Sequence, residues 1–174
     1  FLFYDPFLFT HQGASWVNPS LVPLAGVPFP YDAARMPQCP PELRGTWVQS
    51  SLANYGNDGT VQRVKELIDI AATFRAQRQV PLFCGEFGVY IPNSDNQDRI
   101  YWYDIVRSYL EQKDIAWTIW DYKGGFGLFE KGSSELFDYD LNVPLVGALG
   151  LVAPPQQEFV LTPDVNGFDV YLDY

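Results

Sequence analysis

Two stretches of the chain repeat apolar side chains with the 3.6-residue period of an amphipathic helix. The first helix is predicted over residues 60–76, with Asp58 or Thr60 as its N-terminal cap. In the second stretch, Ser94 and Gln97 have the spacing of a capping box, which predicts a helix to about Glu111. The apolar positions of this second helix are Trp102, Ile105, Val106, Tyr109 and Leu110.

Three shorter runs are apolar without alternation, which is typical of strands that are buried on both faces. They cover residues 1–4, 80–87 and 115–120. A further short helix is predicted over residues 142–151, with Pro144 in its first turn. Strands that alternate with helices predict a parallel sheet with right-handed crossovers. A doubly wound sheet and a β/α barrel both fit this order.

The remaining segments are rich in residues that break regular structure. Residues 17–58 carry many Pro and Gly residues and are expected to form a long irregular connection that is functional or hides short elements. Residues 121–129 form a Gly-rich loop. The tail, residues 154–174, contains two strand-like runs at 158–162 and 168–172.

The composition and charge of the chain limit the classes of function that it could have. The chain of 174 residues has a net charge of −10, which disfavours binding to nucleic acid. Aromatic residues make up 17% of the chain, more than an ordinary core needs, and this surplus indicates a surface that stacks on flat, neutral ligands. No apolar run approaches the roughly 20 residues of a membrane helix, so no membrane association is expected.

The chain starts with Phe1 and lacks the basic segment of a signal peptide, so the sequence reads as the middle of a longer chain. Cys39 and Cys84 are expected to be unpaired, with Cys84 in the core. One His and two scattered Cys offer no ligand spacing for a metal, and no cofactor is expected.

The alternation of side chains along the predicted strands places candidate catalytic residues at one end of the sheet. Alternation places Leu82, Cys84 and Glu86 on one face of their strand, Ala116, Thr118 and Trp120 on one face of the next, and Leu2 with Tyr4 on the first. In a barrel, Glu86, Trp120 and Tyr4 would then stand at the carboxyl ends of neighbouring strands, where β/α barrels have their active sites. Gly85 and Gly88 are expected to let other backbone approach the Glu. A carboxylate, a phenol and an indole together suit a sugar site.

The sequence Pro-Leu-Phe-Cys-Gly-Glu-Phe-Gly at residues 81–88 resembles the nucleophile motif of glycoside hydrolase family 5, whose members are (β/α)8 barrels of the endoglucanase type. Residues 4–16 resemble the sixth strand and following loop of that family, and residues 115–127 its eighth strand and loop. The resemblance covers residues 1 to about 151. It implies a partial TIM barrel, roughly strands six to eight with their helices, in residues 1–153, plus a β-rich tail in residues 154–174 that covers an edge or starts another module.

The resemblance also implies roles for individual residues. Glu86 would be the nucleophile of a retaining β-glycosidase, Tyr4 would hydrogen-bond it, and Trp120 would stack on the sugar beside the cleaved bond. His11, Gln12 and Trp16 would line the cleft. The implied substrate is a β-glucan polysaccharide, and because polymers do not enter cells, the parent enzyme would be secreted or periplasmic.

Two departures from the family pattern stand out. Leu2 occupies the place of a His in the sixth strand, and no Asn-Glu pair, the family's general acid/base motif, occurs in the chain. Retaining hydrolysis needs two carboxyl groups about 5–5.5 Å apart. The chain is also shorter than the about 250 residues of a complete barrel. It therefore reads as a fragment that is inactive alone and that pairs with a missing N-terminal half or with itself.

Two other functions fit parts of the sequence. A non-catalytic carbohydrate-binding remnant would use Trp120, Trp16 and Trp47 as stacking rings. A phosphate-handling α/β enzyme has only the Gly-Gly-Phe-Gly segment at residues 124–127 in its favour, and that segment lacks the following Lys-Ser/Thr of a phosphate loop.

Overall fold

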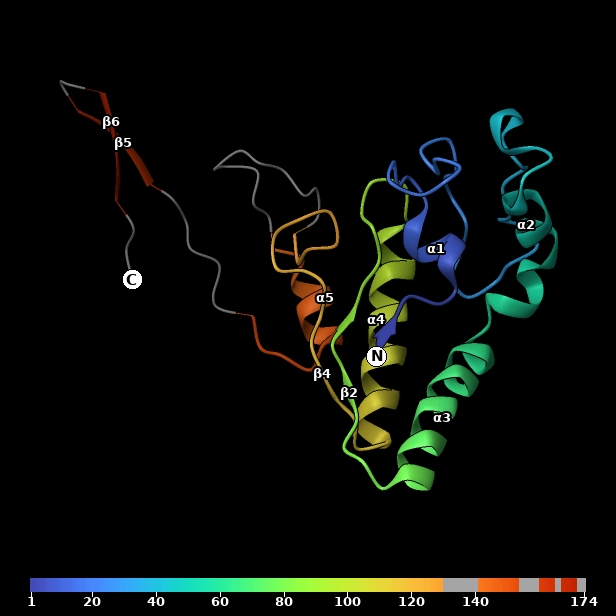
Figure 1. Cartoon of the computed structure of the whole chain (residues 1–174). Coiled ribbons are helices and arrows are strands. Elements are labelled where there is room, and N and C mark those ends of the chain that lie inside the picture. Colours follow the sequence, from blue (N-terminus) through green and yellow to red (C-terminus); the bar gives the residue numbers. More distant parts are fainter. Residues whose placement is uncertain (130–140, 154–159, 165–166, 172–174) are drawn as a thin grey trace.

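The computed structural model describes residues 1–129, 141–153, 160–164 and 167–171. Its centre is a layer of short parallel strands, β1 (Leu2–Phe3), β2 (Phe83–Cys84), β3 (Glu86–Phe87) and β4 (Ala116–Trp117), which form two 2-stranded sheets joined through the segment of β2 and β3. β1 pairs with β3, and β2 pairs with β4. Because β2 and β3 are consecutive pieces of one extended segment, this segment lies between the first and last strands. The predicted parallel order is confirmed (Figure 1).

The extended segment that contains β2 and β3 is interrupted at Gly85. This interruption changes which of its side chains share a face. Cys84 is fully buried, whereas Phe83 is 49% exposed. In β3, Phe87 is buried and pairs with the buried Phe3. The prediction that Cys84 shares the face of Glu86 is therefore wrong, because the alternation restarts after Gly85.

Helices cover one face of this sheet. The helix α3 (Val61–Arg78) begins where the sequence predicted, since the Thr60 hydroxyl accepts a hydrogen bond from the Arg63 amide at 3.0 Å. The helix α4 (Asn96–Gln112) is also confirmed, but its cap is Asp95, which accepts from two amides of the first turn. The predicted capping box is wrong, because the Ser94 hydroxyl donates to the Tyr90 carbonyl instead.

The core lies between this helical layer and the sheet. From α4, Trp102, Val106 and Leu110 are fully buried as predicted, while Ile105 and Tyr109 are partly buried. The helix α5 (Val143–Ala148) packs on α4 and is capped by Asn142. It matches the predicted closing helix, although it ends earlier. No helix within the described part of the chain is long and apolar enough to cross a bilayer.

The segment predicted as irregular contains a missed helix. After the short helix α1 (Phe7–His11) and a 3-10 turn, η1 (Pro41–Leu43), the helix α2 spans Trp47–Asp58. Only Val48 and Tyr55 of α2 are buried. The sequence of α2 therefore shows almost no apolar periodicity from which a helix could be predicted. An ion pair between Arg35 and the buried Asp98 of α4, at 2.7 Å, fastens the connection before α2 to the core.

The opposite face of the sheet is uncovered by the described elements. Leu2 is 61% exposed, and Ala116, which pairs with Phe83, is exposed as well. Within the described residues, β1 pairs only with β3 and β4 only with β2. The sheet therefore has two open edges and one open face.

The tail forms the two predicted strands with shifted bounds. β5 (Val160–Asp164) and β6 (Gly167–Tyr171) form an antiparallel hairpin. These strands form their own two-stranded sheet, and Figure 1 shows the hairpin away from the helical body.

Candidate active site

Tyr4 and Glu86 meet at the carboxyl end of the sheet. Glu86 lies directly beside Leu2 in the β1–β3 register, so the two side chains point to the same, open face. Tyr4 follows Leu2 by two residues and reaches the same side. The Glu86 carboxylate lies near enough to the Tyr4 phenol to act on it electrostatically.

The environment keeps the Tyr4 phenol protonated. Burial raises the pKa of Tyr4 far above its usual value, and the negative charge of Glu86 raises the pKa further. The phenol therefore keeps its proton and stays available as a hydrogen-bond donor beside the carboxylate.

The backbone holds Trp120 beside the end of β3. Its amide donates to the Phe87 carbonyl at 2.9 Å, and its side chain is 49% exposed. A Cβ atom on Gly88 would collide with the Trp120 carbonyl oxygen, so only glycine fits at position 88. The expected close approach at Gly85 is absent, because the nearest atoms to a Cβ there lie at 3.9 Å.

His11 is a buried, neutral imidazole. Burial lowers the pKa of His11 to about 4. The Thr10 hydroxyl donates to the Tyr4 carbonyl at 2.6 Å and lies 2.9 Å from Nδ1 of His11. Because the hydroxyl proton is used on the carbonyl, Nδ1 must carry the ring proton, and Nε2 is left as an acceptor.

Aromatic rings form a wall around these groups. Phe126, from the Gly-rich loop, lies at the centre of the wall, with its ring centroid 5.9 Å from that of Tyr4 and 5.6 Å from that of His11. Trp16 is 57% exposed and meets Tyr90 edge-on at 4.7 Å. Sequence reasoning missed Tyr90 and Phe126. The only signal for Phe126 was a large ring among glycines.

Gln12 does not line a cleft. It has no exposed surface, and its amide nitrogen donates to the carbonyls of Phe9 and Val27 while its oxygen accepts from the Val27 amide. Gln12 therefore fastens the start of the long connection to α1.

The Gly-rich loop is used for packing. Its carbonyls at Gly125, Phe126 and Gly127 accept hydrogen bonds from the Ile91 amide, the Tyr103 hydroxyl and the Arg99 guanidinium. A phosphate loop instead directs its amides at the ligand. The loop therefore gives no support to phosphate chemistry.

Other reactive groups near the sheet are inert. Burial raises the pKa of the Cys84 thiol to about 11, and both cysteines are free thiols. In the described ranges, no three His, Cys, Asp or Glu side chains gather in a way that could hold a metal ion.

Curated endoglucanases are similar to this chain in sequence. No protein-family model matches the chain. Endoglucanase 3 of Fibrobacter succinogenes is 31% identical over 134 residues, which cover 74% of this chain and 20% of that protein. Endoglucanase C of Acetivibrio thermocellus is 33% identical over 127 residues, which cover 71% of this chain and 35% of that protein.

Solved structures agree with these relatives. A hyperthermophilic endo-β-1,4-glucanase in complex with substrate matches with a TM-score of 0.60 and 28% identity, over 86% of this chain and 38% of that one. Cel5A of Thermotoga maritima with cellobiose matches in fold with a TM-score of 0.59, over 85% of this chain and 37% of that one.

The fold is thus part of a glycoside hydrolase TIM barrel. Within that class, the chain is similar to endoglucanases, as is expected of a fragment of a glycoside hydrolase family 5 enzyme. It spans 20% and 35% of the length of the two curated relatives.

Proposed function

We propose that residues 1–153 are the C-terminal part, roughly strands six to eight, of a retaining endo-β-1,4-glucanase that acts on β-glucan. The observation that carries the proposal is the placement of Tyr4 beside the Glu86 carboxylate at the carboxyl end of the parallel strands, which follows from the register of β1 and β3. The kinship with endoglucanases supports the substrate class.

Glu86 is the proposed nucleophile. Its carboxylate attacks the anomeric carbon, the bond to the leaving oxygen breaks, and a second carboxylic acid protonates that oxygen. Water then attacks the same carbon, gives a proton to the second carboxylate and releases Glu86. Tyr4 positions the Glu86 carboxylate throughout, because it remains a hydrogen-bond donor.

Trp120, Trp16 and His11 are proposed to contact the sugar chain. The exposed indoles offer flat apolar surfaces for pyranose rings. The free Nε2 of His11 can accept a hydrogen bond from a sugar hydroxyl.

The second carboxyl group is proposed to come from outside this chain. No Asn-Glu pair occurs in the sequence. Among the described residues, β1 and β4 each have an unpaired edge, and α3 carries the exposed apolar residues Ile70 and Phe74 on its outer side. A missing N-terminal half of the barrel would pair with β1 and β4, cover these residues and supply the acid. The chain alone is therefore expected to have little or no turnover.

Two further assignments follow from this proposal. Because the substrate is a polymer, the parent enzyme would be secreted or periplasmic. The self-paired hairpin β5–β6 favours the interpretation that residues 154–174 begin a separate module, rather than covering a sheet edge.

A carbohydrate-binding remnant is the second candidate, favoured by the exposure of Trp16 and Trp120. It would bind glucan through these rings without hydrolysis. A chain that still binds cello-oligosaccharides but stays inactive after complementation would support it.

The test is complementation. The chain is mixed with an N-terminal half barrel of a family 5 endoglucanase, and hydrolysis of carboxymethylcellulose is measured. Activity should appear only in the mixture and should be lost in Glu86→Gln. The matched control is Glu42→Gln, at an exposed Glu of η1. Undiminished activity in Glu86→Gln would exclude Glu86 as the nucleophile. Activity of the chain without a partner, or a self-associated active form, would exclude the missing half as the source of the acid.

A further inference from the structure

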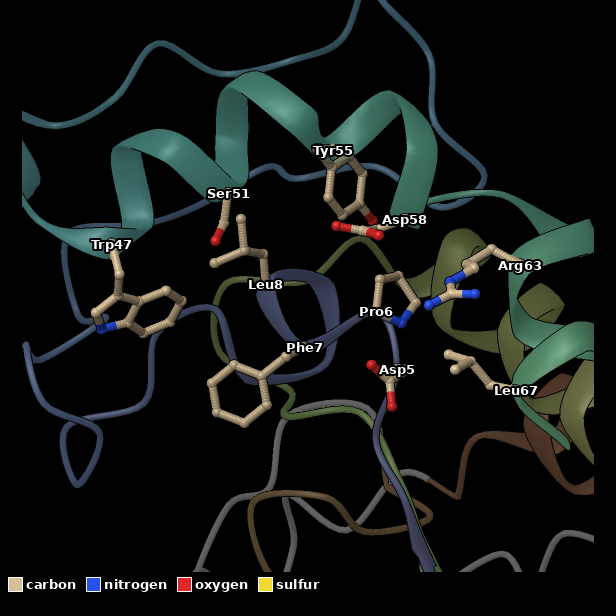
Figure 2. A pocket seen from close by; sticks show the side chains of 10 residues that line it. All are labelled: Asp5, Pro6, Phe7, Leu8, Trp47, Ser51, Tyr55, Asp58, Arg63 and Leu67. Carbon is tan, nitrogen blue, oxygen red and sulfur yellow. The ribbon is translucent and has the colours of Figure 1, made fainter. Parts of the chain in front are cut away.

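A cavity of about 180 Å³ lies between α1, α2 and the first turns of α3. Figure 2 shows that it has two unlike ends, an aromatic end at Phe7 and Trp47 and a charged end at Asp5, Asp58 and Arg63. Leu8, Pro6 and Tyr55 line the space between them. Of the roles given above, only the stacking role of Trp47 in the binding-remnant hypothesis involves a residue of this cavity.

The charged end has unused hydrogen-bonding groups. Among the described residues, neither the Asp5 nor the Asp58 carboxylate has a hydrogen-bond or ion-pair partner, and Arg63 reaches only Glu66, at 3.7 Å. Burial raises the pKa of Asp5, while the charge of Arg63 acts to lower it and that of Asp58 to raise it. Charged groups that face a cavity without partners are typical of a binding site.

The aromatic end is held rigidly. The Phe7 and Trp47 rings lie 6.1 Å apart at 53°, and both remain partly exposed. The indole nitrogen of Trp47 donates to the Asn18 carbonyl at 3.1 Å, which fixes the ring orientation. Fixed, partly exposed rings are the surface on which the apolar face of a sugar stacks.

The cavity adjoins the Glu86 site. Phe7 stacks on His11 at 4.1 Å, and His11 meets Tyr4 edge-on at 5.1 Å. Asp5 directly follows Tyr4 in the chain. A chain of rings therefore connects the cavity to the residue that lies beside Glu86.

We propose that this cavity is a remote subsite that binds one neutral sugar ring of the same glucan chain; the proposal rests on the proposed function. Phe7 and Trp47 contact the apolar face of the ring, the carboxylates of Asp5 and Asp58 accept from its hydroxyls, and Arg63 donates to its oxygens. Two carboxylates against one guanidinium disfavour an acidic sugar. The volume is below the about 300–1,000 Å³ of sites for drug-sized ligands, so it suits a single ring.

The five Trp side chains provide separate reporters. Indole N–H resonances of the chain are followed by NMR during titration with cellohexaose, with Trp47 assigned from Trp47→Phe and Trp120 from Trp120→Phe. The Trp47 signal should shift in a saturable way. Arg63→Met should weaken the affinity read at Trp47 at least fivefold. Arg44→Met, at an exposed Arg, should leave the affinity unchanged.

The responses of Trp47 and Trp120 distinguish the proposed subsite from the proposed function of the Glu86 site. If Trp120 responds to cellohexaose and Trp47 does not, or if Arg63→Met leaves the affinity at Trp47 unchanged, the subsite is excluded and the Glu86 site is retained. If only Trp47 responds, the cavity is a sugar site, and the proposed function loses its support. A cellohexaose variant with oxidised, acidic sugar units should bind more weakly at Trp47, and equal or tighter binding would contradict the neutral-ring assignment.

Discussion

Tyr4 and Glu86, which lie far apart in the sequence, are brought close together because Leu2 and Glu86 occupy the same register position of β1 and β3. The two strands are parallel, so residues that follow them emerge at the same end of the sheet. This proximity therefore depends on the register as well as on the two side chains.

Loss of the Tyr4 hydroxyl should slow the proposed reaction more than it changes binding. In the complemented enzyme, Tyr4→Phe should lower kcat about 10- to 100-fold, because a hydrogen bond to a charged group contributes about 1.5–3 kcal/mol. The KM should change little. Tyr101→Phe, at an exposed Tyr of α4, is the control. An unchanged kcat in Tyr4→Phe would show that Glu86 needs no orientation by this phenol.

His11 gives the stability of the chain a defined pH dependence. It is the only His in the sequence, and burial lowers its pKa from 6.5 to about 4. Between these values the unfolded chain binds a proton that the folded chain does not, so stability should fall as the pH falls from 6.5 to 4. The linked loss is at most about 3 kcal/mol.

The measurement compares urea unfolding of the parent chain and of His11→Gln at several pH values. Carboxylates affect both proteins equally, so the difference between the two curves reports on His11. The imidazole should also titrate near pH 4 by NMR. Titration near 6.5 would mean that the ring is solvated in the folded chain.

Much of the helical structure could be predicted because it has a local cause. The period of α4 and the Thr60 cap of α3 are readable from neighbouring residues. The interruption at Gly85 was not readable, because it arises from pairing with two different strands. α2 was missed because it buries only Val48 and Tyr55.

The candidate site, like the fold, was only partly predictable from the sequence. The motif around Glu86 could be found in the sequence, but the ring of Phe126 and the cavity at Trp47 depend on contacts between segments distant in the chain. The burial of Gln12 likewise comes from its bonds to Val27, across a connection without regular structure.

The two glycines beside Glu86 should respond differently to the same substitution. Gly88→Ala places a methyl group against the Trp120 carbonyl oxygen and should cost about 1–3 kcal/mol of stability. Gly85→Ala meets only ordinary contacts and should be tolerated. Thermal unfolding of both variants tests this difference. Equal destabilisation would show that Trp120 does not approach position 88 as the structure has it.

The outer side of α3 should matter for complementation and not for the fold of the isolated chain. Ile70 is 64% exposed and Phe74 is 50% exposed, so Ile70→Gln with Phe74→Gln removes little buried apolar surface from the chain itself. In the proposed barrel these side chains are covered by the missing half. The double variant should therefore unfold at about the same temperature as the parent but require a higher concentration of the N-terminal half to restore activity. Gln112→Ala, at an exposed residue of α4, should complement like the parent. If the double variant complements equally well, the missing half does not dock on this side of α3.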